Sequence, residues 1–166
     1  MIICGGGVRY SEAGDELAAF STQFNIPFGE TQAGKGTIVW DHQMNMGGTG
    51  VCGTSASNII AHEADLVLAV GTRLNDFVTA SKWNFHHPDV KLVSLNVNNF
   101  DAYKMNGTPF LCDAREGLSA IQAKLASKSY ESEWKQRPTE LYKEWKIEND
   151  RYYNTDDSQE GFTQTK

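Results

Sequence analysis

Residues 65–71 form an unbroken apolar run, Leu-Val-Leu-Ala-Val, between an aspartate and a glycine. A strand that is continuously apolar is typical of a parallel sheet with helices on both faces. Residues 92–97 give a second, mostly apolar run, Leu-Val-Ser-Leu-Asn-Val, after an interval long enough to hold a crossover connection. The two runs therefore predict neighbouring parallel strands that are fully buried, and this pair limits the fold more than any other feature of the sequence.

The rest of the chain alternates between short apolar runs and helical patterns. We expect further strands at residues 1–4, 26–28 and 109–112 and a helix over residues 55–64. The glycine-rich stretch between residues 29 and 53 is expected to form loops. This alternation predicts an α/β fold, a Rossmann-like doubly wound parallel sheet flanked by helices.

Two further helices are expected to begin at the N-caps Ser11 and Asp113. Their apolar residues recur at helical spacing, which predicts one buried stripe on each helix. The stripes are Leu17, Phe20 and Phe24 on the first helix and Leu118, Ile121 and Leu125 on the second.

We divide the chain into a domain over residues 1–126 and a charged segment over residues 127–166. A helix is expected to open at Pro138, and the residues after Tyr153 are expected to be disordered. We interpret the segment as an interdomain linker that packs on a neighbouring domain. Trp134 and Trp145 would then be exposed or packed on each other in this chain.

The composition disfavours several classes of partner. The net charge of −6 argues against nucleic acid and anionic membranes, which favour a basic face. No stretch approaches the ~20 apolar residues of a membrane span, and no signal peptide is visible. Three scattered cysteines indicate a reducing compartment, and hence a cytoplasmic protein. The apolar run at residues 1–4 adds the expectation that the chain is a piece cut at a domain boundary.

The sequence predicts no catalytic residue and no metal site. Gly5-Gly6-Gly7 follows the first strand but lacks the third glycine of the dinucleotide fingerprint, so Glu30 alone gives little support for a ribose-binding NAD site. None of the histidines pairs with a carboxylate at the spacing of metal ligands. They are His42, His62, His86 and His87.

The most specific string begins at residue 50 and reads Gly-Val-Cys-Gly-Thr, followed by Asn58, Ala-Asp-Leu-Val-Leu from residue 64 and Gly-Thr-Arg-Leu-Asn-Asp from residue 71. Together with Ile-Pro-Phe at residues 26–28 and Gly-Lys-Gly at residues 34–36, it resembles the central domain of thiamine-diphosphate-dependent enzymes. The resemblance covers roughly residues 1–126. It implies a parallel sheet of about six strands that lies between two thiamine-binding domains.

One branch of this family, the acetolactate synthases, uses the central domain to hold FAD. Two departures from that branch suggest a vestigial nucleotide groove: Val51-Cys52 replaces Met-His, and Asn96-Val97-Asn98 replaces Asp-Ile-Asp. The positions that match the cofactor-binding residues of that branch are Gly6, Gly7, Gly50, Gly53, Thr72 and Arg73.

A narrower resemblance, over residues 28–35, 81–83 and 96–104, is to the ring-opening hydrolases of myo-inositol breakdown, which release 5-deoxyglucuronate. It implies that thiamine diphosphate and Mg²⁺ are bound by flanking domains of the same polypeptide, in a parent that is a homo-oligomer. This chain carries only Gly14-Asp15-Glu16, which departs from the Gly-Asp-Gly motif of the family and falls in an expected helix. We therefore expect the chain alone to bind neither thiamine diphosphate nor FAD and to be inert.

Two alternatives remain open. The chain could be the FAD- or ADP-binding central domain of an acetolactate synthase-like carboligase or decarboxylase, or it could be a free-standing nucleotide-binding protein. The missing dinucleotide fingerprint and the asparagines Asn96 and Asn98 favour the hydrolase domain over both.

Overall fold

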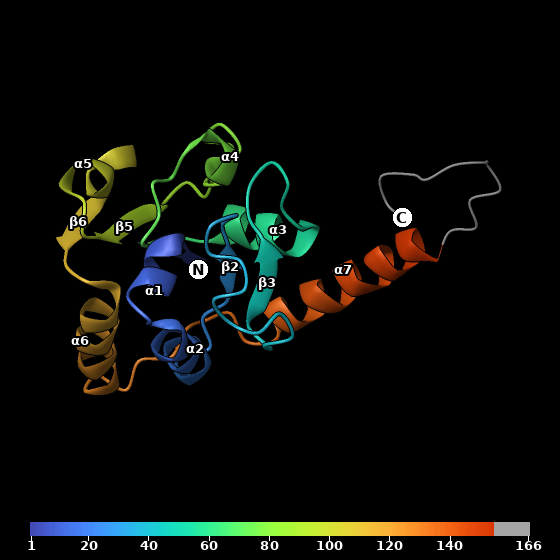
Figure 1. The fold of residues 1–166 in the computed structure, drawn as a ribbon. Helices are drawn as coiled ribbons and strands as arrows, with labels where there is room; N and C mark the ends of the chain where they lie inside the picture. Colours follow the sequence, from blue (N-terminus) through green and yellow to red (C-terminus); the bar gives the residue numbers. More distant parts are fainter. Residues whose placement is uncertain (155–166) are drawn as a thin grey trace.

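The computed structural model describes residues 1–154, and these form one sheet of six parallel strands in the order β3-β2-β1-β4-β5-β6 (Figure 1). This arrangement confirms the predicted fold class. The expectation of disorder after Tyr153 falls mainly on residues 155–166, which lie outside the described part. The strands are β1 (Ile2–Cys4), β2 (Phe28–Glu30), β3 (Asn45–Gly48), β4 (Leu66–Val70), β5 (Lys91–Asn96) and β6 (Thr108–Leu111).

Helices cover both faces of the sheet, and each face has its own core. On one face α2 packs on α6, and on the other α3 packs on α7. None of the helices within residues 1–154 combines the length and the apolar character that crossing a bilayer would need. The helices are α1 (Gly6–Tyr10), α2 (Gly14–Gln23), α3 (Ser55–Glu63), α4 (Asp76–Thr79), α5 (Asn99–Ala102), α6 (Ala114–Ala126) and α7 (Arg137–Tyr153), with a 3₁₀ turn at Lys104–Asn106.

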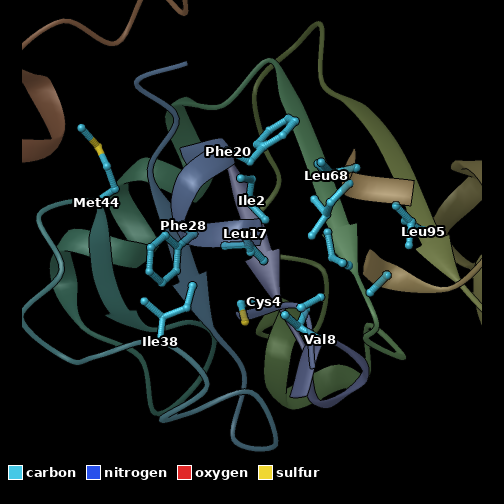
Figure 2. Close-up of a cluster of buried hydrophobic side chains, with 14 of the residues drawn as sticks. Ile2, Cys4, Val8, Leu17, Phe20, Phe28, Ile38, Met44, Leu68 and Leu95 are labelled. Carbon is cyan, nitrogen blue, oxygen red and sulfur yellow. The ribbon is translucent and has the colours of Figure 1, made fainter. Parts of the chain in front are cut away.

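The central strands are apolar throughout because alternate side chains enter different cores. In β1, Ile2 and Cys4 point into the core beneath α2 and α6 (Figure 2), whereas Ile3 joins the core beneath α3. In β4, Leu68 belongs to the first core and Val67 to the second. The predicted helix stripes also hold, since Leu17, Phe20, Phe24 and Leu118 are fully buried and Ile121 and Leu125 pack beside them.

The prediction for β4 and β5 is confirmed in its pairing and wrong in its burial. The strands are parallel neighbours, with Val70 opposite Leu95. However, Leu66 is 43% exposed and Val97 is 75% exposed. Leu66 begins its strand at the rim of the sheet, and Val97 follows the last residue of β5, so the helices do not cover either side chain.

Three local expectations need correction. The glycine-rich stretch contains a strand, β3, in which Met46 is the residue with a large buried side chain. Ser11 ends α1 instead of starting α2, and its hydroxyl hydrogen-bonds to the carboxylate of Asp113 at 2.6 Å. The strand expected at residues 26–28 begins only at Phe28. Because β3 has only four residues, two of them glycines, it gives almost no alternating apolar pattern in the sequence.

The N-cap expected at Asp113 is present, because its carboxylate accepts a hydrogen bond from the Arg115 N–H at 2.9 Å. The two edges of the sheet are β3 and β6. The β6 edge contains Pro109, which pairs with Ser94 of β5.

The segment after residue 126 lies against the domain. Leu141 of α7 is buried in the core beneath α3, and the Arg137 guanidinium bonds to the Glu63 carboxylate at the end of α3. Trp134 and Trp145 are half-buried on that same core, so the expectation of exposed or mutually packed indoles is wrong. The physical reason is that α7 runs along α3, which provides an apolar surface within this chain. The boundary at residue 126 itself stays a prediction.

For a chain with a free α-amine at Met1, burial of that amine predicts a pH dependence of folding. It donates to the Leu66 carbonyl at 2.6 Å, and burial lowers its pKa to about 5, with Asp65 acting in the opposite direction. The unfolded amine has a pKa of about 8, so the unfolded chain binds more protons between these values and stability should fall as the pH decreases. Three pH units correspond to about 4 kcal/mol.

Urea unfolding measured across this pH range checks the prediction. A chain extended by residues before Met1 has an amide at this position and should lose most of the slope. An equal slope in both chains would contradict the assignment to this amine.

Candidate functional site

The sheet order places β1 and β4 side by side. After β1 the chain continues to β2 on one side of this pair, and after β4 it continues to β5 on the other side. Such a switch point, at the carboxyl ends of the strands, is where doubly wound folds usually bind ligands. Of the predicted groove residues, Gly6 and Gly7 follow β1 and Thr72 follows β4. The structure places Gly7 against Gly71, the residue before Thr72, whereas a Cβ on Gly6 would instead meet the Ala33 side chain at 3.0 Å.

Backbone contact closes this switch point. The N–H of Gly7 donates to the Gly71 carbonyl at 2.9 Å, and the N–H of Gly5 donates to the Val70 carbonyl at 2.9 Å. A Cβ on Gly7 would lie 2.6 Å from the Gly71 Cα, and Gly71 has a φ of +59°. Because the Gly7 N–H already bonds to Gly71, it is not available to donate a hydrogen bond to a phosphate group. The nucleotide groove stays a prediction.

Gly50 and Gly53 form a second group, in the loop between β3 and α3. Gly50 has a φ of +101°, and its backbone lies so close to α4 that a Cβ would meet the Phe77 carbonyl. The Asn58 side chain holds this loop by bonding to both the N–H and the carbonyl of Gly50 at 2.9 Å. The contacts explain these glycines as parts of a packed loop without reference to a ligand.

Arg73 is exposed and takes part in no ion pair within residues 1–154. The neighbouring Thr72 is held by Asn96, whose side-chain N–H donates to the Thr72 carbonyl at 3.0 Å. The Asn96 side-chain oxygen accepts from the Asn98 N–H at 2.9 Å. An ionised aspartate could not donate the first of these bonds. The asparagine that the sequence suggested as a lost nucleotide ligand is therefore a structural support.

The described residues do not fit thiamine diphosphate with its metal ion. Within residues 1–154, no three His, Cys, Asp or Glu side chains come together where they could hold a metal. Asp15 lies exposed in the first turn of α2. His62 and His86 instead pack on each other and on Trp83, with ring centroids 4.7 to 5.9 Å apart.

A cavity of about 400 Å³ lies at the carboxyl ends of β2 and β3, and α7 closes one side of it. The sequence analysis considered two residues of this cavity, Glu30 and Cys52, for separate reasons. It did not predict that both lie beside α7, which is about a hundred residues away in the chain. The lining comes from the two strands, the loops that follow them, α4 and α7. Its polar and aromatic members include Glu30, Lys35, Trp40, Asn45, Thr49, Cys52, Tyr142, Trp145 and Lys146.

Glu30 is the buried ionisable group of this cavity. Its side chain accepts a hydrogen bond from the Gly36 N–H at 3.2 Å. Burial raises the pKa of Glu30, while hydrogen bonds from Gly36 and Asn45 and the charge of Lys35 lower it. The carboxylate also raises the pKa of the neighbouring Cys4 thiol, which burial brings to about 12, so that Cys4 is unreactive at neutral pH.

The comparisons with known proteins agree with the sequence resemblance. A family described as "Thiamine pyrophosphate enzyme, central domain" matches residues 1–121. The chain is 45% identical over 162 residues to the 3D-(3,5/4)-trihydroxycyclohexane-1,2-dione hydrolase of Clostridium tetani, which covers 98% of the chain and 25% of that protein. It is 50% identical over 154 residues to the protein of the same name from Clostridium botulinum strain Alaska E43, with coverage of 93% and 24%.

A relative of the same name from Bacillus cereus is 44% identical over 154 residues, which are 93% of the chain and 24% of that protein. The chain thus spans about a quarter of the length of the curated relatives it matches. Both the predicted family and its hydrolase branch are confirmed as what this chain resembles.

The closed switch point predicts that Gly7→Ala is far more destabilising than Gly48→Ala. The added methyl group meets backbone atoms at Gly7, whereas at Gly48 its nearest neighbour lies at an ordinary 3.6 Å. We expect a loss of roughly 2–3 kcal/mol or more for Gly7→Ala, as for overpacked cores, and little change for Gly48→Ala. Chemical denaturation measures both, and equal losses would count against the proposed contact.

The buried carboxylate predicts that Glu30→Gln stabilises the chain at neutral pH. The pKa of Glu30 is higher in the folded chain than in the unfolded chain, so the ionised carboxylate lowers the free energy of unfolding. This destabilisation is fully present above the folded pKa and disappears as the pH falls below the unfolded pKa. The stability difference between the variant and the parent chain should therefore shrink on acidification. Melting temperatures compared from neutral to mildly acidic pH check this, and a constant difference would rule it out.

Proposed function

Since the chain belongs to the family of thiamine pyrophosphate enzyme central domains, we propose that it is the non-catalytic central domain of a trihydroxycyclohexane-1,2-dione hydrolase. The observation that carries the proposal is the coverage of the relatives. They match 93–98% of this chain, well beyond residue 121, while the match occupies only 24–25% of their own length. Most of such a protein therefore lies outside the part that this chain represents.

The proposed parent opens a six-membered ring by hydrolysis of a carbon–carbon bond. Thiamine diphosphate supplies carbanion stabilisation for reactions of this type. The described residues do not fit that cofactor or its Mg²⁺, so no step of the reaction is assigned to this chain. Its proposed role is to hold the cofactor-binding domains of the same polypeptide at a fixed separation, for which a rigid sheet with two cores is suited.

Exposed apolar residues support contact with neighbouring domains. Trp40, Phe77 and Trp83 are each more than 60% exposed, in the loops and the short helix near the carboxyl ends of the strands. Large exposed apolar side chains of this kind are candidates for contact with a partner surface. We propose that the flanking domains cover them in a homo-oligomeric parent. The free thiols Cys4, Cys52 and Cys112 suit a cytoplasmic location.

Activity measurements on two proteins test this proposal. The chain alone should release no product from trihydroxycyclohexane-1,2-dione, whereas the full-length gene product that contains it should hydrolyse the compound when supplied with thiamine diphosphate and Mg²⁺. Turnover by the chain alone, or an inactive full-length protein, would overturn the assignment.

Calorimetric titration of the chain with FAD serves as the control for the alternative function. Micromolar binding, about 8 kcal/mol, would favour an FAD-binding carboligase domain instead.

A further inference from the structure

Helix α7 is held on the domain by few buried side chains. Of its 17 residues only Pro138 and Leu141 are buried, and Leu141 is the one that belongs to the core beneath α3. Trp145 is half-buried on the same core, and residues 150–154 are all exposed (Figure 1). Segments with few buried apolar contacts open at a lower free energy than the core of a domain. The helix should therefore separate from the sheet more readily than the strands separate from one another.

The polar contacts that hold α7 lie at the surface. The Arg137 Nε donates to the Glu63 carboxylate at 3.0 Å, and both side chains are partly exposed. The Lys146 Nζ lies 5.6 Å from the centre of the Trp40 ring, and Trp40 is itself exposed. Exposed charge pairs contribute little to stability because water and salt screen them. These contacts align the helix on the domain without fixing it there.

The chain is anchored directly before α7, at the end of α2. The Ser132 N–H donates to the Phe24 carbonyl at 3.1 Å, and its hydroxyl donates to the Asn25 carbonyl at 2.5 Å. The Asn25 side-chain amide donates to the Lys135 carbonyl at 3.2 Å. Lys135 has a φ of +50°, and α7 begins two residues later. None of these bonds involves α7, so the helix can turn about Lys135 and Gln136 while the anchor stays closed.

Helix α7 can move as one body because it supports its own backbone. Within the helix, Arg151 pairs with Glu148 at 3.0 Å and Lys146 pairs with Asp150 at 3.9 Å. Pairs at this spacing stabilise isolated helices. The length of 17 residues also exceeds the ~12–15 residues below which isolated helices are marginal. Separation from the sheet therefore does not require the helix to unfold completely.

Movement of α7 would uncover two surfaces. One is the core beneath α3, where Leu141 and Trp145 now pack. The other is the cavity of about 400 Å³ at the carboxyl ends of β2 and β3, because α7 closes one side of it. The remaining walls come from the strands and from loops that are not part of α7. The helix thus has the position of a lid on a cavity that the rest of the domain forms.

We propose that α7 is a lid that turns about Lys135 and opens while the sheet stays folded. The structure shows the closed state, in which Leu141 is buried (Figure 1). In the open state the anchor on α2 and the strands that line the cavity keep their structure, and the cavity loses its α7 wall. Access to the cavity then depends on the docking equilibrium of α7, a property that goes beyond the proposed function.

Alkylation of a cysteine introduced at residue 141 of the 166-residue chain tests the proposal, with the labelled sites resolved by peptide mass spectrometry. In Leu141→Cys the thiol reacts only when α7 leaves the sheet. Ile147→Cys, at a position 72% exposed on the same helix, gives the rate of an unprotected thiol. Cys4 of β1 is fully buried and reports opening of the sheet itself. We expect the Leu141→Cys rate to lie between these two, on the order of tenfold or more from each.

Either limit would overturn the proposal. A Leu141→Cys rate equal to that of Cys4 would mean that α7 separates only when the sheet unfolds. A rate equal to that of Ile147→Cys would mean that α7 is not docked. If Leu141→Cys fails to fold, amide hydrogen exchange of the unmodified chain decides the question. Amides at residues 143–147 should then exchange faster than those of β1 and β4, and equal rates would overturn the lid.

A matched pair of charge variants tests the docking contact. Arg137→Gln removes the ion pair to Glu63 and should raise the Leu141→Cys rate about 1.5- to 5-fold, the range for an exposed ion pair, with no change at Cys4. Lys143→Gln removes a charge from an exposed position of the same helix and should change neither rate. Equal effects of the two variants would count against the lid. The proposed function is tested by activity, so its outcome is independent of these rates.

Discussion

Close backbone contact between the ends of β1 and β4 is the constraint on which the rest of this structure depends. Gly5 and Gly7 lie directly on Gly71, and the hydrogen bond from Gly7 to Gly71 fixes the distance between the two strand ends. Any side chain here would separate the strands that carry both cores. The Asn96 amide then fixes the next residue, Thr72, so the loop after β4 is held from two sides. At the location where doubly wound proteins usually bind ligands, this backbone contact joins the two halves of the sheet.

The sequence predicts the features that repeat along the chain. The apolar runs of β4 and β5 and the stripes of α2 and α6 arise from burial on regular elements, so their spacing is enough to locate them. β3 was missed because a four-residue edge strand with two glycines has almost no pattern. Ser11 was misplaced because its hydroxyl serves a partner about a hundred residues away, Asp113, rather than its own helix. The fold class thus follows from local periodicity, whereas β3 has too little of it and the position of Ser11 depends on a contact between distant segments.

The candidate cavity illustrates the same limit at the level of function. Glu30 and Asn45 come from adjacent strands, but the aromatic wall that makes the space concave comes from α7. No local pattern connects residue 30 with residue 145, so only the folded chain shows that they face one cavity. The glycines of the predicted groove show the opposite case. The resemblance predicts them as groove residues, whereas their close contacts give them a structural use that the resemblance alone does not reveal.

The proline in β6 has a consequence for how copies of this sheet behave at high concentration. Cys112 donates its N–H to Asn96 of β5, so alternate residues of β6 face that strand, while Pro109 and Leu111 face outward. Pro109 has no N–H, and the outer edge therefore lacks one of the donors that another strand would need. Pro109 therefore disfavours growth of the sheet by strand addition at β6, the usual route from an open edge to fibrous aggregates.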